Sequence, residues 1–185
     1  AGASAGSGYI QVFEWSLSEG RWQGVHSFGP PDSSGITAFG QALTLSADSS
    51  IVAVHASDKA IVYSVANLLA GLEGTPIVVD LTGKSINDLS VSSGAVAVGY
   101  TSTRGNASIW SLDLDQGTLG SEIVLSPTGD GHSDHFGQSV SLSASGQWLA
   151  VGAPGDMEWQ FLPENQGWEE EVWYSEEVEV WDIVG

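Results

Sequence analysis

One cluster in the sequence has side chains that could hold a metal ion. Asp130, His132 and Asp134 alternate along the chain, and His135 follows directly. A hard cation needs more oxygen ligands than this segment offers, and a zinc ion would need further ligands from elsewhere. The segment also lies immediately before a repeat unit, where the chain has to turn. We therefore interpret it as a turn and predict no metal ion and no other cofactor.

Hydrolytic chemistry is the second possibility to consider. Asp113 and Asp115 could form a pair of the glycosidase type, but they lie on or just after one strand, beside a glycine-containing turn. We interpret them as solvated charge. His26 and His55 each stand alone in strand-like segments, which is typical of structural histidines. No serine lies in a Gly-x-Ser-x-Gly elbow, and no glycine loop is of the phosphate-binding type. The sequence predicts that the chain is not an enzyme; a hydrolase completed by acids from outside these residues is the remaining alternative.

Residues 156–177 form the best candidate for a binding surface. The segment has no counterpart in the other repeat units and is rich in tryptophan and glutamate. Aromatic side chains on loops of a rigid scaffold are typical of surfaces that recognise proteins or sugars. An additional hairpin packed on the edge of the domain is the structural alternative. The candidate contact residues are Trp159, Trp168, Glu169, Glu170, Glu171, Trp173 and Tyr174.

Asn106-Ala107-Ser108 matches the acceptor pattern for N-glycosylation, just before a predicted strand. We take Asn106 as a candidate glycosylation site, which agrees with a secreted protein. The chain has no cysteine, so disulfides and thiolate chemistry are both excluded.

The charge of the chain excludes several classes of partner. Four basic residues stand against 23 acidic ones, and the net charge is −19. Binding to nucleic acid or to an anionic membrane surface needs many lysines and arginines, so neither is predicted. No apolar run is long enough for direct membrane insertion. Residues 105–185 hold fifteen acids and no base, which indicates either a solvated surface or a docking face for a basic partner or for cations.

The elements that must position these residues are organised as a repeat. Three segments share one pattern, in which an alternating Leu/Val and Ser/Thr strand, a short polar turn and an Ala-Val strand follow each other. They are residues 38–54, 88–99 and 135–154. The Ala-Val steps at 53, 97 and 150 are 44 and 53 residues apart, which is close to the period of β-propeller blades.

Each unit continues with a strand that ends in an aromatic residue and then a more polar outer strand. The sequence therefore predicts an all-β fold made of propeller blades of four antiparallel strands. We expect a single repeat domain over residues 1–185, in which residues 1–30 form a partial blade, 36–82 and 85–126 form blades, and 133–185 form a partial blade with the insertion 156–177. The phase of the repeat at the two ends favours an incomplete propeller or a segment of a larger one.

One copy of the repeat also resembles a known family. Phe136-Gly137-Gln138 followed by Leu149-Ala150-Val151-Gly152-Ala153-Pro154 is similar to an FG-GAP repeat, the blade unit of integrin-α-type propellers. Phe39-Gly40 is a weaker copy, and Ile86-Asn87-Asp88 is degenerate. The resemblance implies adhesion, ligand recognition or scaffolding. It does not carry over the calcium site of the family, because loops such as 46–50 contain a single aspartate where several oxygen ligands are required.

These observations together predict a non-catalytic binding or scaffolding module of a secreted or cell-surface protein, which recognises a protein or glycan partner. A structural subunit of a large complex that docks a basic neighbour is the alternative. We expect the chain to belong to a longer protein or to an assembly, with an extracellular or cell-surface location; the lumen of an organelle is the other possibility.

Overall fold

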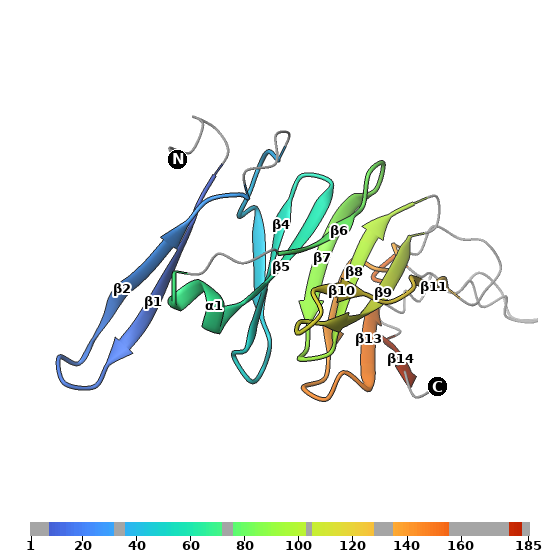
Figure 1. Ribbon diagram of the computed structural model, residues 1–185. Helices are drawn as coiled ribbons and strands as arrows, with labels where there is room; N and C mark the ends of the chain where they lie inside the picture. The colour runs from blue at the N-terminus through green and yellow to red at the C-terminus, as the bar shows by residue number, and fades with distance from the viewer. Residues whose placement is uncertain are drawn as a thin grey trace, which may run out of the picture.

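The protein is an array of antiparallel sheets that lie side by side (Figure 1), as the computed structural model shows. The structure describes residues 8–31, 36–71, 76–102, 105–127, 135–155 and 178–182. The predicted all-β fold class is confirmed, because a single short helix accompanies the strands of the described residues. No helix among the described residues is long and apolar enough to cross a membrane.

The first two sheets, which we call blade 1 and blade 2, differ in completeness. Among the described residues, blade 1 consists of β1 (Ile10–Ser16) and β2 (Arg21–Phe28). Blade 2 has the order β3-β4-β5-β6. Its strands are β3 (Ala42–Leu45), β4 (Ile51–Ala56), β5 (Lys59–Ser64) and β6 (Ile77–Asp80), and α1 (Val65–Leu69) lies between β5 and β6.

Blade 3 has five strands, because two short segments share the outer edge of one strand. Its strands are β7 (Ser85–Val91), β8 (Ala95–Thr101), β9 (Asn106–Asp113), β10 (Thr118–Leu119) and β11 (Ile123–Leu125). Both β10 and β11 pair with β9. Blade 4 comprises β12 (Ser139–Leu142), β13 (Trp148–Gly152) and β14 (Val178–Asp182), in that order across the sheet.

The apolar cores lie between successive blades. In β4, Val52 and Val54 pack towards blade 1, whereas Ile51 and Ala53 pack towards blade 3. All six residues of β4 are buried, since its side chains alternate between two such cores. A third core fills the space between blades 3 and 4. This arrangement explains why the second strand of each unit has no polar face in the sequence.

The two Phe-Gly steps of the sequence form the same turn. Gly40 and Gln41 both donate their backbone N–H to the carbonyl of His55, and Gly137 and Gln138 both donate to the carbonyl of Gly152. In each turn the residue before the phenylalanine and the glycine after it have positive φ angles: 53° and 86° in blade 2, 54° and 83° in blade 4. The phenylalanine between them is buried in both copies.

Each Phe-Gly turn is held against the preceding blade by a glycine. Gly8 and Gly105, with φ angles of 82° and 81°, come just before the strands β1 and β9. A Cβ atom on Gly8 would overlap the carbonyl group of Phe39, and one on Gly105 would overlap that of Phe136. The backbones therefore approach as closely as glycine allows, and we call this contact the Gly–Phe clasp.

Candidate binding surface

The inner strands of blades 2, 3 and 4 have equivalent positions that can be compared directly. In each hairpin a serine closes the turn through a 2.9 Å hydrogen bond from its N–H to a carbonyl across the turn. These serines are Ser46, Ser92 and Ser143. Counting back one and three residues from each serine gives the three equivalent pairs Leu45/Leu43, Val91/Leu89 and Leu142/Val140.

Only one of the three pairs is exposed. Leu89 and Val91 are 6% and 5% exposed, and Val140 is 7% exposed. Leu43 and Leu45, in contrast, are 52% and 55% exposed. The alternation in the sequence predicts a half-buried strand with both leucines inward, so their exposure is a departure that requires a local reason.

The difference lies in what the described residues place against this side of each strand. Ala95 and Ala97 on β8, the second strand of blade 3, belong to the same core as Val140. The corresponding strand of blade 1 would pair with β1, but within the described residues β1 pairs with β2 alone. Nothing in the described part of blade 1 therefore covers the side of β3 that carries Leu43 and Leu45.

Aromatic side chains are exposed on the opposite side of blade 1. Phe13 and Trp15 alternate along β1, and Trp22 lies directly opposite Trp15 on β2. The two indole rings meet edge to face, with centroids 5.6 Å apart, and the three side chains are 52%, 45% and 65% exposed. We call Phe13, Trp15 and Trp22 the aromatic face. The corresponding residues of β9, Trp110 and Leu112, are buried against blade 2.

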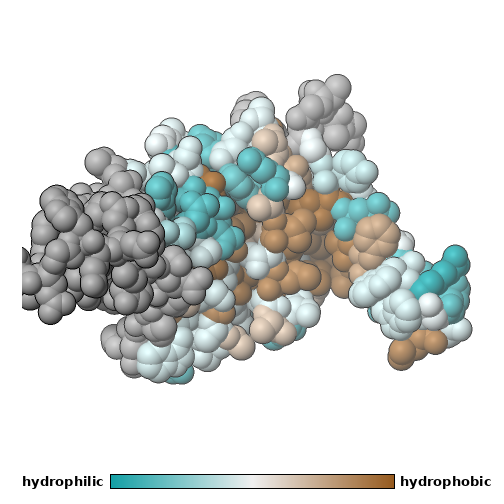
Figure 2. Space-filling model, turned by 180° about the vertical axis from the view of Figure 1, so that it is seen from behind, coloured by the Kyte–Doolittle hydropathy of each residue, from teal (hydrophilic) through white to brown (hydrophobic). Residues whose placement is uncertain are grey.

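Figure 2 shows where hydrophobic residues lie on the surface of the molecule. Seen from behind, a broad hydrophobic area lies beside the protruding β1–β2 hairpin, whereas hydrophilic residues dominate the hairpin tip itself. Exposed apolar patches of this kind are unusual on soluble monomers unless they bind something.

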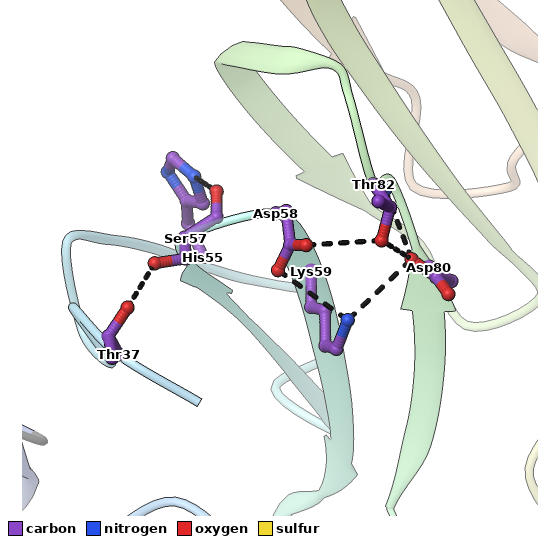
Figure 3. Close-up of polar contacts among 7 residues, drawn as sticks. All are labelled: Thr37, His55, Ser57, Asp58, Lys59, Asp80 and Thr82. Atoms are coloured by element: carbon purple, nitrogen blue, oxygen red, sulfur yellow. Dashed lines mark hydrogen bonds and ion pairs between the residues drawn. The ribbon is translucent and has the colours of Figure 1, made fainter. Parts of the chain in front are cut away.

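A polar cluster lies at one end of blade 2, where the β4–β5 turn meets the end of β6 (Figure 3). Lys59 Nζ lies 3.5 Å from Asp58 Oδ1 and 3.6 Å from Asp80 Oδ1. Thr82 Oγ1 donates to both carboxylates, at 3.1 and 2.6 Å. The hydrogen bonds from Thr82, aided by the charge of Lys59, lower the pKa of Asp80. These contacts tie the β4–β5 turn to the end of β6.

His55 does not join that cluster. Its Nε2 donates to the carbonyl of Ser57 at 2.9 Å, and the residue is buried. Within the described ranges, no three His, Asp or Glu side chains lie close enough together to hold a metal ion.

The comparisons with known proteins address the fold. No family model matches the sequence, and no curated protein matches it significantly. Among solved structures, Sqt1 from Chaetomium thermophilum superposes with a TM-score of 0.53 and 21% identity, over 80% of this chain and 37% of that one. The chain folds as β-propeller blades.

Two further solved structures are similar, with lower TM-scores. The mitotic checkpoint complex matches 94% of this chain and 42% of its own at 14% identity, with a TM-score of 0.49. U3-55K matches 77% of this chain and 41% of its own at 15% identity, with a TM-score of 0.43. The propeller segment described here spans about two fifths of the length of these structures.

Most of the site residues predicted from the sequence cannot be placed. Residues 156–177, with Trp159, Trp168, Glu169, Glu170, Glu171, Trp173 and Tyr174, lie outside the described residues, as do Asp130, His132 and Asp134. The contact surface predicted there stays a prediction.

Asn106 and Asp113 are both placed, at the two ends of β9. Asn106 is its first residue and is half-buried; its Oδ1 accepts a hydrogen bond from Ser126 Oγ at 3.1 Å. Glycosylation of Asn106 remains untested by this geometry. Asp113 is the last residue of the strand, and its Oδ1 accepts the N–H of Gln116 at 2.9 Å. Asp113 and the exposed Asp115 therefore lie at a solvent-exposed turn.

The β3–β4 turn, residues 46–50, is closed by internal hydrogen bonds. Asp48 Oδ1 accepts from Ser46 Oγ at 2.6 Å and from the N–H and Oγ of Ser50 at 3.1 and 2.8 Å. These bonds, that from Ser46 first, lower the pKa of Asp48. A single carboxylate whose Oδ1 accepts three hydrogen bonds thus organises the β3–β4 turn.

Sequence reasoning missed the exposed surface of blades 1 and 2. The sequence identifies Trp15 and Trp22 only as residues of strands. It predicts that Leu43 and Leu45 lie on the buried side of a half-buried strand. The strand pattern of these segments gives no sign of this exposure, because it depends on what lies next to each strand.

A partly exposed ion pair lies at the edge of blade 3. Lys84 Nζ lies 2.7 Å from Glu122 Oε1 and 4.4 Å from the centroid of the Tyr100 ring. Partial burial acts to lower the pKa of Lys84, but the hydrogen bond to Glu122 and the attraction of Tyr100 and Glu122 outweigh it, so the pKa is raised. The hydrogen bond from Lys84 lowers the pKa of Glu122 against partial burial, and a 2.7 Å bond from Ser108 adds to this.

We expect Glu122→Gln to lower the free energy of unfolding at pH 7 by about 1 kcal/mol or less, because the pair is partly exposed. The lowered pKa of Glu122 means that its contribution is present above its unfolded pKa and disappears as the pH falls through its folded pKa. Wild type and variant should therefore converge in acid. Urea unfolding at pH 7 and at about pH 3.5 measures this. Glu19→Gln, which breaks the exposed pair with Arg21, is the control, and an equal loss there would contradict the prediction.

Proposed function

We propose that this chain is a non-catalytic propeller module that binds a partner protein. The aromatic face of Phe13, Trp15 and Trp22 carries the proposal, because its three large side chains stay at least 45% exposed. Trp110 and Leu112, the counterparts of Phe13 and Trp15 on β9, are buried. Tryptophan is enriched among the residues that dominate binding energy, especially when it is held rigidly. The cross-strand pairing of Trp15 with Trp22 holds both rings in this way.

The Gly–Phe clasp supports the resemblance of this chain to FG-GAP propellers. Phe39-Gly40 and Phe136-Gly137, the residues that carry the resemblance, make equivalent contacts with the preceding blades. On this proposal the protein is secreted or displayed at a cell surface, and the insertion 156–177 adds a second contact face. The same Trp pair could also stack on a sugar ring, so a glycan is the alternative ligand.

A second candidate function, docking on a basic neighbour, has its own support. Every described lysine and arginine is already paired with a carboxylate: Arg21 with Glu19, Lys59 with Asp58 and Asp80, and Lys84 with Glu122. The remaining acids, in a chain of net charge −19, therefore have no described basic partner. A partner bound in this way would dissociate as salt is raised towards 0.5 M, whereas a partner on the aromatic face would stay bound.

Affinity capture with the tagged chain from a native extract tests the aromatic face. We expect the double variant Trp15→Ser/Trp22→Ser to reduce recovery of the partner at least tenfold, measured by quantitative mass spectrometry, because hot-spot tryptophans cost about 2 kcal/mol or more when removed. The matched control is Ile123→Ser/Val124→Ser, which changes two exposed apolar residues of β11.

A glycan array probed with the same three proteins separates the alternatives. Binding of the wild type to a glycan, lost in the tryptophan variant, would replace the protein partner by a sugar. Equal partner recovery with the tryptophan variant and with the wild type would exclude the aromatic face as the contact surface.

A further inference from the structure

The N-glycosylation acceptor pattern Asn106-Ala107-Ser108, which we call the sequon, begins a strand that has a neighbour on each side. β8 pairs with all three of its residues, and β11 pairs with Ala107 and Ser108 from the other side (Figure 1). Acceptor patterns that are modified ordinarily lie in accessible surface loops. The finished blade 3 therefore holds the backbone of the sequon where a modifying enzyme cannot grip it.

The hydroxyl group of the sequon is buried and fully used. Ser108 is 0% exposed, and its Oγ donates to Glu122 Oε1 at 2.7 Å. Since its own proton is used there, Ser108 Oγ accepts from the Tyr100 hydroxyl, at 3.2 Å. Lys84 Nζ lies 2.7 Å from the same Oε1 and holds the carboxylate in place. Because the acceptor pattern requires the hydroxyl of its third residue, residues 122–125 close the sequon once they are paired.

The side chain of Asn106, in contrast, lies where the closed blade can accommodate a sugar. Asn106 is the first residue of β9 and is half-buried. Its Oδ1 accepts a hydrogen bond from Oγ of the exposed Ser126 at 3.1 Å, which places the carboxamide near the surface. N-linked modification replaces one hydrogen of Nδ2 and leaves Oδ1 free. The hydrogen bond from Ser126 can therefore persist in the modified protein.

We propose that Asn106 receives an N-linked oligosaccharide only while β11 is not yet paired with β9, and keeps it when blade 3 closes. The proposal rests on the secretion that is part of the proposed function. In the reaction Nδ2 forms a bond to the anomeric carbon of a lipid-diphosphate-linked oligosaccharide, the lipid diphosphate leaves, and Nδ2 gives up one proton. Ile123, where β11 begins, follows Asn106 by 17 positions. At about 5–20 residues per second, the sequon is open for at least about 1–3 seconds during synthesis.

The hydrogen-bonding direction of β11 offers a matched pair of variants. Gly120 donates its N–H to the carbonyl of Ser111 on β9, so Ser111 bonds outward. Because bonding direction alternates along a strand, Ile109 also bonds outward, and its partner Ile123 bonds back to it. The N–H of Val124, the next residue, then points to solvent. Ile123→Pro therefore removes a ladder hydrogen bond and Val124→Pro removes none, although the two side chains are 53% and 51% exposed.

Transfer to the purified full chain tests the closed state. The chain is produced without glycosylation, folded, and incubated with a purified oligosaccharyltransferase and its lipid-linked oligosaccharide, and intact mass spectrometry gives the rate. We expect the wild type to be modified at least tenfold more slowly than Ser16→Asn/Asn106→Gln, which moves the sequon to the β1–β2 turn, where Ser18 is exposed. Ile123→Pro should raise the rate at Asn106 at least tenfold above that of the wild type, and Val124→Pro by no more than twofold.

A linear peptide keeps the test independent of how the proline variants fold. Residues 102–112 contain the sequon without the strands that cover it, and this peptide should be modified at least tenfold faster than the folded wild type. A peptide that is not modified, or a folded wild type that is modified as fast as the peptide, would overturn the proposal. A folded Ile123→Pro chain, checked by circular dichroism, that resists modification as the wild type does would remove β11 as the element that closes the sequon.

Secretion of the full chain from a glycosylating host tests the open state. We expect the secreted protein to carry a glycan that Asn106→Gln and Ser108→Ala both abolish, and a secreted protein with Asn106 unoccupied would contradict the proposal. The outcome is separable from that of the proposed function, because Trp15→Ser/Trp22→Ser should leave the occupancy of Asn106 unchanged. Loss of partner capture in the tryptophan variant, with no transfer to Asn106 in any form of the chain, would retain the aromatic face and remove the glycan.

Discussion

Gly137→Ala is expected to lower the free energy of unfolding by about 3 kcal/mol or more. The residue has a φ of 83°, where an L side chain is strained by about 1–2 kcal/mol. A Cβ atom at this position would also overlap the carbonyl oxygen of Asn106 in the preceding blade. Because the obstacle is backbone rather than a flexible side chain, relieving it requires the two blades to separate, and overpacking of this kind adds about 1–3 kcal/mol.

Gly83→Ala is the matched control for this prediction. Gly83 has nearly the same φ, 82°, but a Cβ atom there would meet nothing within 4 Å. The variant should lose only the strain of about 1–2 kcal/mol. Urea unfolding of the two variants, followed by far-ultraviolet circular dichroism, measures the difference. Equal losses would mean that the close approach of Gly137 to Asn106 does not hold blades 3 and 4 together.

The turns at the Phe-Gly steps show which parts of the fold the sequence could predict. The Phe-Gly steps and the Leu/Val–Ser alternation placed the inner hairpins of blades 2 and 4 correctly, because turn residues and strand period are local signals. The short helix after β5 was also foreseeable from residues 65–72. The pairing of β9 with both β10 and β11 was not, since two- and three-residue strands leave no periodic pattern.

Blade 3 lacks the Phe-Gly step of the other copies but still packs against blade 4. Where the other copies have Phe-Gly, blade 3 has a register shift between Ile86 and Asp88. Asn87 Nδ2 donates to the carbonyl of Gly137 at 3.3 Å, and Asp88 accepts from Val140. Polar side chains thus contribute to the contact between blades 3 and 4. Such a substitution of contacts cannot be read from one sequence, because the partners lie about fifty residues apart.

The candidate binding surfaces were predictable only in part for a similar reason. Burial of Leu43 depends on a strand paired with β1, and the local pattern of β3 is the same whether that strand is present or not. Exposure of Trp15 likewise depends on the neighbour on the far side of blade 1. Local sequence determines which face of a strand is apolar, whereas the neighbouring blade determines whether that face is covered.

Phe136→Ala should produce a loss of about 3–5 kcal/mol, the range for removing a buried phenylalanine side chain. The ring is 1% exposed and lies in the core shared by blades 3 and 4, beside Leu149 and Val151. The Gly–Phe clasp holds its backbone against Gly105, so the site cannot collapse to fill the cavity. Phe13→Ala removes the same atoms from a side chain that is 52% exposed and should cost about 1 kcal/mol or less. Thermal and urea unfolding of both variants provide the measurement. Similar losses for the two would show that blades 3 and 4 are not packed around Phe136.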